Sequence, residues 1–155
     1  ENGNWSPNNI KKVWSRGLGT KVKFKIKKMS VLGNYSFTRS TNELSTNELD
    51  DTVGEQLRYV PLHKGNIGIT FTKDNLQFNL NKSYTGEVIT TYGSLNNNTL
   101  DEFILTDISV KYTYDKLPIT ILCKVKNLTD KSYITYENYP NPGRELLLTI
   151  NYTIN

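Results

Sequence analysis

Side chains that can perform catalysis or bind a metal ion are scarce in this sequence. Its 155 residues include a single His (His63) and a single Cys (Cys123). These counts exclude an internal disulfide, a His-pair metal site and the common zinc clusters, and they make a Ser-His-Asp triad a poor hypothesis. No nucleophile beside a base, Gly-rich phosphate loop or close carboxylate pair is recognisable. We therefore expect a protein that is not an enzyme and holds no metal ion or cofactor.

One acidic segment could bind a cation. Residues 40–44 and 45–49 repeat Ser-Thr-Asn-Glu-Leu, and the carboxylates of Asp50, Asp51 and Glu55 follow. Carboxylate oxygens are the ligands that Ca²⁺ prefers. The simpler interpretation, which we favour, is a solvated surface loop that arose by a short duplication.

Aromatic residues are the most distinctive part of the composition, with ten Tyr, five Phe and two Trp. Tyr offers a rigid ring face and a hydroxyl, so Tyr in loops can contact a ligand. The Tyr residues that we expect in such loops are Tyr92, Tyr133, Tyr136 and Tyr139. The net charge of +4 does not by itself predict nucleic-acid binding, because a footprint needs its basic charge on one face.

The elements that carry these side chains are predicted to be β-strands. Residues 21–27 alternate strictly between Lys and apolar side chains, and six further segments repeat this period of two. A chain without Ala that is rich in Tyr, Thr, Ile and Val is also a good strand former. We predict an all-β fold of seven strands, at about 17–27, 29–39, 61–73, 75–86, 102–115, 118–128 and 144–154.

Short and long connections alternate between these strands. Tight turns are expected at 27–28, 73–75 and 115–117, and long connections at 40–60, 87–101 and 129–143. An antiparallel up-and-down meander with short turns at one end and long loops at the other is typical of outer-membrane barrels.

Two interpretations of the alternation compete. In a soluble β domain the apolar face points to a core, whereas in a membrane barrel it meets lipid and the polar face lines the lumen. Predicted strands of about 10–13 residues suit a tilted membrane crossing of about 9–11 residues better than the soluble mean of about 5–6. Polar inner positions such as Gln77, Asn79 and Asn81, and aromatics near strand ends, also favour the membrane.

Three segments resemble motifs of TonB-dependent outer-membrane receptors. Residues 58–64 resemble the Pro-x-His opening of a late barrel strand, residues 125–133 resemble the Asn-Leu-x-Asp segment, and residues 139–145 resemble the Pro-Gly-Arg approach to the last strand. Arg144 could bind an anion or a lipopolysaccharide phosphate, although we favour a structural role. The matching residues, all expected to be structural, are Pro61, His63, Asn127, Leu128, Asp130, Tyr133, Pro142, Gly143 and Arg144.

This resemblance implies that residues 1–155 are one unit, the last third of a 22-stranded transmembrane barrel that encloses a plug. Single-chain bacterial barrels have even strand numbers, so seven strands imply a fragment or one chain of a split receptor. The implied partners are the rest of the barrel and its plug, outer-membrane lipid and lipopolysaccharide, and the TonB complex. The implied function is import of an iron–siderophore, haem or cobalamin, with the C-terminus periplasmic and the long loops extracellular.

Several positions depart from the family pattern. A fourth segment, residues 17–19 before an alternating strand, resembles the family's Gly-x-Glu strand opening, but Gly19 stands where the family often has Glu. Ile154 followed by Asn155 stands where the family usually ends on an aromatic residue. Lys82 falls on the apolar register of its strand, so we expect either a bulge or a side chain that reaches the rim. Two alternatives remain open: a soluble all-β module that binds a ligand such as a carbohydrate, and a passive porin-like channel.

Overall fold

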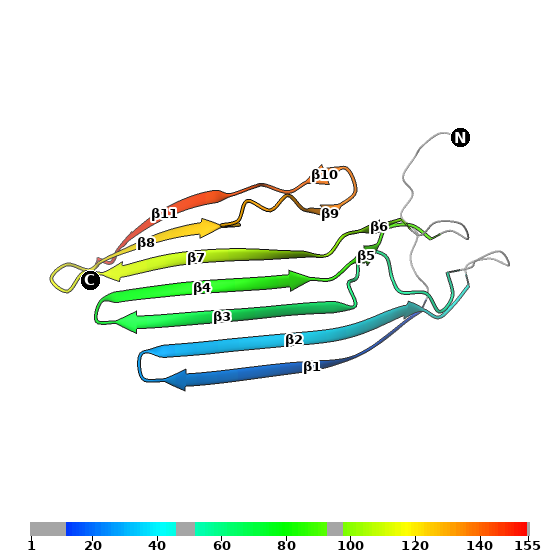
Figure 1. The fold of residues 1–155 in the computed structure, drawn as a ribbon, viewed down its shortest axis with the longest axis horizontal. Helices are drawn as coiled ribbons and strands as arrows, with labels where there is room; N and C mark the ends of the chain where they lie inside the picture. Colours follow the sequence, from blue (N-terminus) through cyan, green and yellow to red (C-terminus); the bar gives the residue numbers. More distant parts are fainter. Residues whose placement is uncertain (1–11, 46–51, 93–97, 155) are drawn as a thin grey trace.

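The computed structural model describes residues 12–45, 52–92 and 98–154, and its regular structure is entirely β (Figure 1). Seven long strands form one antiparallel sheet in the order β1-β2-β3-β4-β7-β8-β11. Their bounds are β1 Val13–Ile26, β2 Met29–Asn42, β3 His63–Lys73, β4 Leu76–Thr85, β7 Phe103–Thr113, β8 Ile119–Lys126 and β11 Glu145–Tyr152. Two small hairpins, β5 Val88–Ile89 with β6 Thr99–Leu100 and β9 Ile134–Tyr136 with β10 Tyr139–Pro140, lie in the long connections.

The predicted meander of seven strands is confirmed, with three differences. β1 begins at Val13 and β2 ends at Asn42, because their ladder continues past the point where the alternation of side chains breaks down. β8 has only 8 residues, since Pro118 precedes it and Asn127 follows it in the left-handed conformation, with a φ of 47°. The third turn, expected at 115–117, occupies the five residues between Thr113 and Ile119.

The strand register places each long strand's side chains on two faces. Directly opposed residues share a face, and pairs such as Phe24↔Val31, Phe71↔Phe78 and Leu80↔Ile108 define an apolar face, hereafter the outer face. The alternating positions define the inner face, with Lys21, Lys23 and Lys25 on β1 and amides and hydroxyls on β3, β4 and β7. The expected bulge at Lys82 is absent: this residue pairs with Ile67 and Thr106 in unbroken register, on the outer face.

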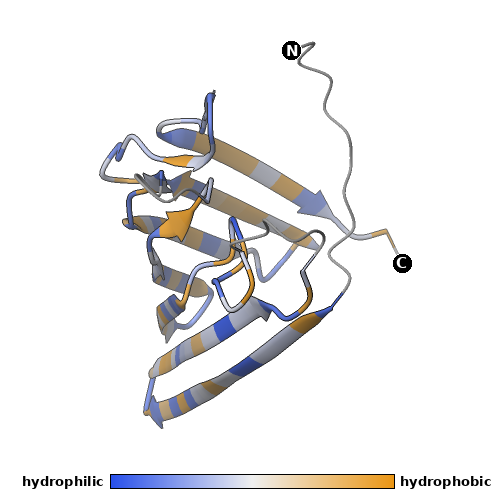
Figure 2. Cartoon of the chain, turned by 90° about the vertical axis from the view of Figure 1, so that its right-hand side faces the viewer, coloured by the Kyte–Doolittle hydropathy of each residue, from blue (hydrophilic) through white to orange (hydrophobic). Residues whose placement is uncertain are grey.

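The described sheet has no hydrophobic core. No Val, Ile, Leu, Met or aromatic residue in the described ranges is buried, and outer-face side chains such as Leu18 and Leu146 are 79% and 82% exposed. Figures 1 and 2 show why: the long strands form one curved layer, and no second layer covers either face. Such a sheet does not bury its apolar face as a soluble sandwich does, so the interpretation as a self-sufficient globule is not supported.

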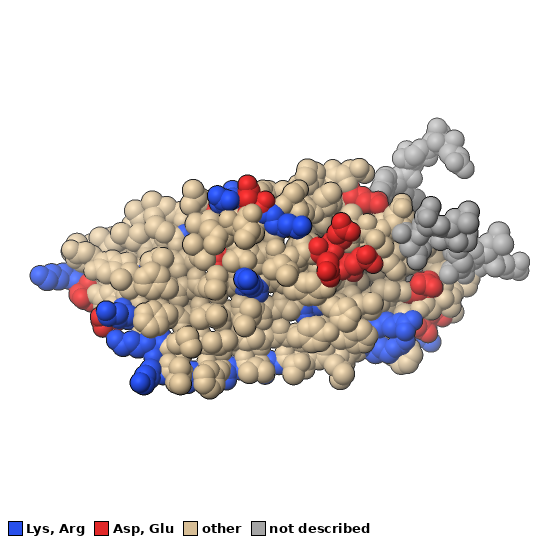
Figure 3. Space-filling model, viewed as in Figure 1, with Lys and Arg blue, Asp and Glu red and all other residues tan. Residues whose placement is uncertain are grey.

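The described residues include no helix long and apolar enough to cross a membrane. The space-filling view shows instead a broad surface of uncharged residues along the long strands, with charged side chains mostly towards its margins (Figure 3).

Candidate ligand-binding surface

The long connections meet at one end of the sheet, and a buried polar cluster joins them there. Gln56 is 9% exposed, accepts a hydrogen bond from the Ser40 N–H (2.9 Å) and donates to the carbonyl of Val60 (2.9 Å). The hydroxyl of Tyr92 donates to the Gln56 carbonyl (2.7 Å), so the second long connection is attached to the first. Buried polar groups need such hydrogen-bond partners. These bonds tie the first and second long connections together at this end of the sheet.

The hairpin β5–β6 links the other two connections. Tyr59 N–H donates to the carbonyl of Ile89 (2.8 Å), and Thr90, 2% exposed, has its hydroxyl 2.7 Å from the carboxylate of Glu137 in the β9–β10 turn. Segments that are far apart in the sequence therefore contact one another at the loop end.

Three tyrosines form an aromatic ladder across these loops. The rings of Tyr59 and Tyr136 are stacked with centroids 4.6 Å apart, and Tyr139 meets Tyr136 edge-on at 5.7 Å. Tyr59 has a φ of 59°, a left-handed conformation that is uncommon for an aromatic residue. Tyr139 is 68% exposed, so the ladder ends on a ring that is free to stack with a ligand.

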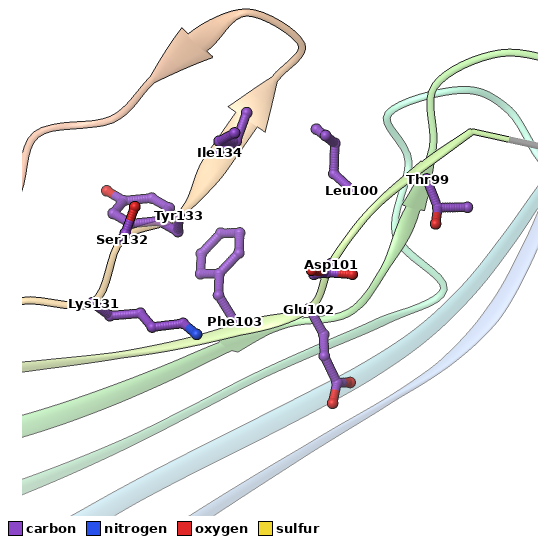
Figure 4. Close-up of a pocket in the computed structure, with 9 residues that line it drawn as sticks. All are labelled: Thr99, Leu100, Asp101, Glu102, Phe103, Lys131, Ser132, Tyr133 and Ile134. Carbon is purple, nitrogen blue, oxygen red and sulfur yellow. The ribbon is translucent and has the colours of Figure 1, made fainter.

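A cavity of about 230 Å³ lies beside the ladder, between the start of β7 and the segment before β9 (Figure 4). Phe103 and Tyr133 both line it, and their rings pack against each other with centroids 4.7 Å apart. Asp101 and Lys131 also line the cavity. The site thus combines aromatic faces with both signs of charge.

A second cavity of about 210 Å³ adjoins the first, since both are lined by Asp101 and Phe103. Lys64 and Thr85 line it as well, and Phe103 is the cross-strand partner of Thr85, which in turn opposes Lys64. These three residues are on the inner face of the sheet. The cavities therefore open at the loop end of the inner face.

Two loop tyrosines have perturbed ionisation. Burial raises the pKa of the Tyr59 phenol above its usual value, and the nearby carboxylate of Glu137 adds to the effect. Burial also raises the pKa of Tyr92, against the opposing effect of Arg58, whose guanidinium lies 5.6 Å from the Tyr92 ring. Both phenols are therefore neutral hydrogen-bond donors at neutral pH.

Motif residues of the third long connection hold its backbone in place through hydrogen bonds. The Asp130 carboxylate accepts a hydrogen bond from the Arg144 N–H (2.8 Å), and a Cβ on Gly143 would lie 2.8 Å from the same oxygen, so a larger residue there would have to displace this carboxylate. The Asn127 side chain bonds both the N–H and the carbonyl of Lys131 at 2.9 Å, and it closes the turn within the Asn-Leu-x-Asp segment.

The motif at the start of β3 lies on the outer side of the sheet. The Tyr35 hydroxyl is 2.7 Å from Nδ1 of His63, and Phe37 packs against the same ring at 5.3 Å. Pro61, just before β3, is buried. We see no group of three or more metal-ligating side chains among the described residues, and Glu48, Asp50 and Asp51 of the acidic segment lie outside them.

The four Tyr residues proposed from the sequence have different surroundings. Tyr136 and Tyr139 belong to the ladder and Tyr133 lines the cavity, whereas Tyr92 is engaged by Gln56 and Arg58. Sequence reasoning missed Tyr59 and Phe103, since nothing in the chain signals the long-range ring contacts that bring them to this surface.

Comparison with known families matches residues 1–128 to the TonB dependent receptor-like, beta-barrel family. No curated protein matches the chain significantly. Among solved structures, similar ones include the ferric-catecholate import receptor Fiu from E. coli K12 (TM-score 0.70, 19% identity, covering 88% of this chain and 20% of that one). The ferric citrate transporter FecA has a TM-score of 0.73 and 21% identity, over 88% of this chain and 23% of that one. The copper transporter OprC has a TM-score of 0.70 and 12% identity, over 89% of this chain and 22% of that one. The chain thus spans about a fifth of the length of these structures.

Proposed function

The chain belongs to the TonB dependent receptor-like β-barrel family, and on this basis we propose that it forms part of the wall of an outer-membrane receptor that imports a scarce ligand. The family consists of transport receptors and not of enzymes, in agreement with the absence of a catalytic motif from the sequence. An open sheet of seven strands leaves unpaired edges on β1 and β11, which lipid does not tolerate. Further strands and a plug, supplied by the rest of the receptor, would close the barrel.

We place the short turns on the periplasmic side and the aromatic ladder and cavities on the extracellular side. Outer-membrane barrels keep short turns inside the cell envelope and longer loops outside it. A ligand arriving from the medium would then reach the exposed ring of Tyr139 first and the inner-face cavities next.

The ligand class that we favour is an iron–siderophore chelate. The observation that carries this choice is the stack of aromatic rings beside cavities at the mouth of the inner face, where Lys64 and Lys131 offer ammonium groups next to the carboxylates of Asp101 and Glu102. Chelates of this kind are compact, polar and often anionic, so ring faces and ammonium groups suit them. The names of Fiu and FecA, which refer to ferric catecholate and ferric citrate, support the same choice.

Uptake would be driven by the TonB complex through the plug, and not by passive diffusion. This point separates the proposal from a porin-like channel, and it is testable in cells. Bacteria that express the receptor should accumulate the radiolabelled iron chelate, and deletion of TonB should abolish accumulation. Uptake that persists without TonB would favour the passive channel.

The ligand surface is tested by removing the ladder. In the full receptor, Tyr136→Ala with Tyr139→Ala should raise the Kd for the iron chelate about tenfold, which corresponds to about 1.4 kcal/mol. Tyr112→Ala on the outer face near the opposite end is the matched control and should leave the Kd unchanged. An unchanged Kd in the double variant would remove the ladder from the ligand site.

A further inference from the structure

Three lysines line one margin of the inner face. Lys21, Lys23 and Lys25 occupy alternate positions of β1, and all three are exposed. Alternate residues of a strand lie on the same face, about 6.6 Å apart at about 3.3 Å per residue. The three ammonium groups therefore form a row, hereafter the lysine row, which runs from the middle of β1 towards the short turn.

The lysine row has no acidic partner in the strands around it. β1, β2, β3 and β4 contain neither Asp nor Glu. The ion pairs found among the described residues, Lys124–Asp107 and Lys126–Glu145, lie at the other side of the sheet, on and beside β7, β8 and β11. The inner face therefore carries its uncompensated positive charge mainly along β1.

The lysine row continues from the ligand cavities towards the short turns. Lys64, which lines the second cavity, is the cross-strand partner of Ser36, and Ser36 is in turn the partner of Gly19. The lysine row begins two residues further along β1, at Lys21. Small side chains thus separate the cavity from the row, and a Cβ on Gly19 would meet no atom within 4 Å.

The wall beside the lysine row is polar but uncharged. On the inner face of β3 and β4, Asn66 hydrogen-bonds to Asn81, and Thr70 hydrogen-bonds to Asn79. These groups spend part of their hydrogen-bonding capacity on one another and exert no charge attraction on a passing molecule. The lysine row is consequently the element of this wall that can attract an anion at a distance.

We infer that the lysine row guides an anionic iron chelate along the inner face of β1, from the cavities towards the short turns. The inference rests on the proposed function, which supplies the ligand class and the direction of movement. Conduction requires attraction that is strong enough for entry and weak enough at each position for release. Lysine meets both needs, because its ammonium is a hydrated point charge on a flexible stem, without the rigid fork of arginine.

The potential at the lysine row can be measured without knowledge of the ligand. In the full receptor, reconstituted in lipid vesicles with Cys123→Val, a single cysteine replaces Asn34, the cross-strand partner of Lys21. Its rates of reaction with an anionic and a cationic methanethiosulfonate are compared, so that any change in thiol reactivity cancels in their ratio. K21Q/K23Q/K25Q should lower the anionic-to-cationic rate ratio about tenfold.

The matched control is K28Q/K73Q/K116Q, which removes the same charge at the short-turn end of the sheet. These lysines lie well beyond the Debye length of about 8 Å from Asn34, so the control should leave the ratio unchanged. If the triple variant of the row does not assemble, K23Q alone should lower the ratio about twofold.

Two results of this measurement would overturn the inference. A ratio that is the same in wild type and K21Q/K23Q/K25Q would mean that carboxylates of the plug already neutralise the row. A thiol that neither reagent reaches would mean that no aqueous path follows β1.

Uptake measurements connect the row to transport and separate this inference from the proposed function. The probes are a radiolabelled anionic ferric tricatecholate and an uncharged ferric trihydroxamate. K21Q/K23Q/K25Q should lower the maximal rate of tricatecholate uptake several-fold at an unchanged Kd, and should leave any trihydroxamate uptake as it is.

Equal losses for both chelates would indicate that the lysines seat the plug, and import of the uncharged chelate alone would show that the receptor has no use for an anion-guiding row. Either result would overturn the inference and leave the proposed function standing. A receptor that imports neither chelate would contradict the proposed function, whereas the rate ratio at Asn34 would still support or overturn the attraction of anions by the row.

Discussion

The two faces of the same sheet differ in what their side chains contact. On the inner face, a polar ladder crosses the strands: Asn66 donates to Asn81 (3.0 Å), Thr70 to Asn79 (2.9 Å) and Asn79 to Ser109 (3.2 Å). The residues that alternate with these polar side chains along β3 and β4 point to the outer face, where apolar side chains such as Ile67 and Phe78 are exposed. Figure 2 shows this alternation as hydrophobic and hydrophilic bands along each strand. We propose that the faces are built for two different solvents, lipid outside and water inside.

The largest expected effect comes from a charge placed on the outer face. Ile108→Arg puts a guanidinium at the middle of β7 among Leu80 and Val125. We expect the free energy of unfolding of the full receptor in lipid vesicles, measured by denaturant titration, to fall by about 2–4 kcal/mol. Ser83→Arg, on the inner face of the neighbouring strand β4 between Asn66 and Leu105, should cost less than about 1 kcal/mol. Equal losses would remove the distinction between the faces.

An intermediate effect is expected from Asp107 on the inner face. Its carboxylate accepts the N–H of Asn127 (3.0 Å) and lies 3.5 Å from Nζ of Lys124. Asp107→Ala should lower the unfolding free energy by about 1–3 kcal/mol, because Asn127 is 3% exposed and its N–H would lose its acceptor. Asp107→Asn keeps an acceptor and loses only the half-exposed ion pair, so we expect at most about 1 kcal/mol. The same denaturant titration measures both, and a larger loss in Asp107→Asn would make the charge the dominant contribution.

The smallest effect concerns the exception on the outer face, Lys82. Replacement by Leu should raise the unfolding free energy by about 0–1 kcal/mol, because Lys82, two residues from Leu80 towards the loop end, can extend its long side chain towards the loop-side interface. Lys111→Leu on the inner face should give no gain, since that ammonium faces water. A loss of stability in Lys82→Leu would mean that the ammonium has a specific partner in the complete receptor.

The sequence predicts the long strands better than the loop end of the sheet, because the strands depend on local patterns and the loop end on long-range contacts. The strict alternation of residues 21–27, and the turn at 27–28, depend on local chemistry and are found as expected. The ladder of Tyr59 and Tyr136, and the cavity lined by Phe103 and Tyr133, depend on contacts between distant segments that leave no periodic pattern in the sequence.

The motif residues occupy an intermediate position. The resemblance to a family identifies Asp130 and Arg144 as motif residues, but only the three-dimensional structure shows the hydrogen bond that joins them. The same is true of Arg16 and Arg39, whose opposition follows only from the register of β1 against β2. Arg16 lies just before the first predicted strand and Arg39 is the last residue of the second, so the alternation pattern does not assign either residue to a face.

The most direct test of the two-solvent account is a spin-label scan along β4. Single cysteines would replace each residue from Gln77 to Asn81 in the full receptor, after Cys123, which is itself exposed on the outer face, is changed to Val. Collisions with oxygen report lipid contact and collisions with a water-soluble nickel complex report water. We predict oxygen maxima at Phe78 and Leu80 and nickel maxima at Gln77, Asn79 and Asn81. If Phe78 and Leu80 are shielded from both reagents, the apolar face is buried against protein and the account is wrong.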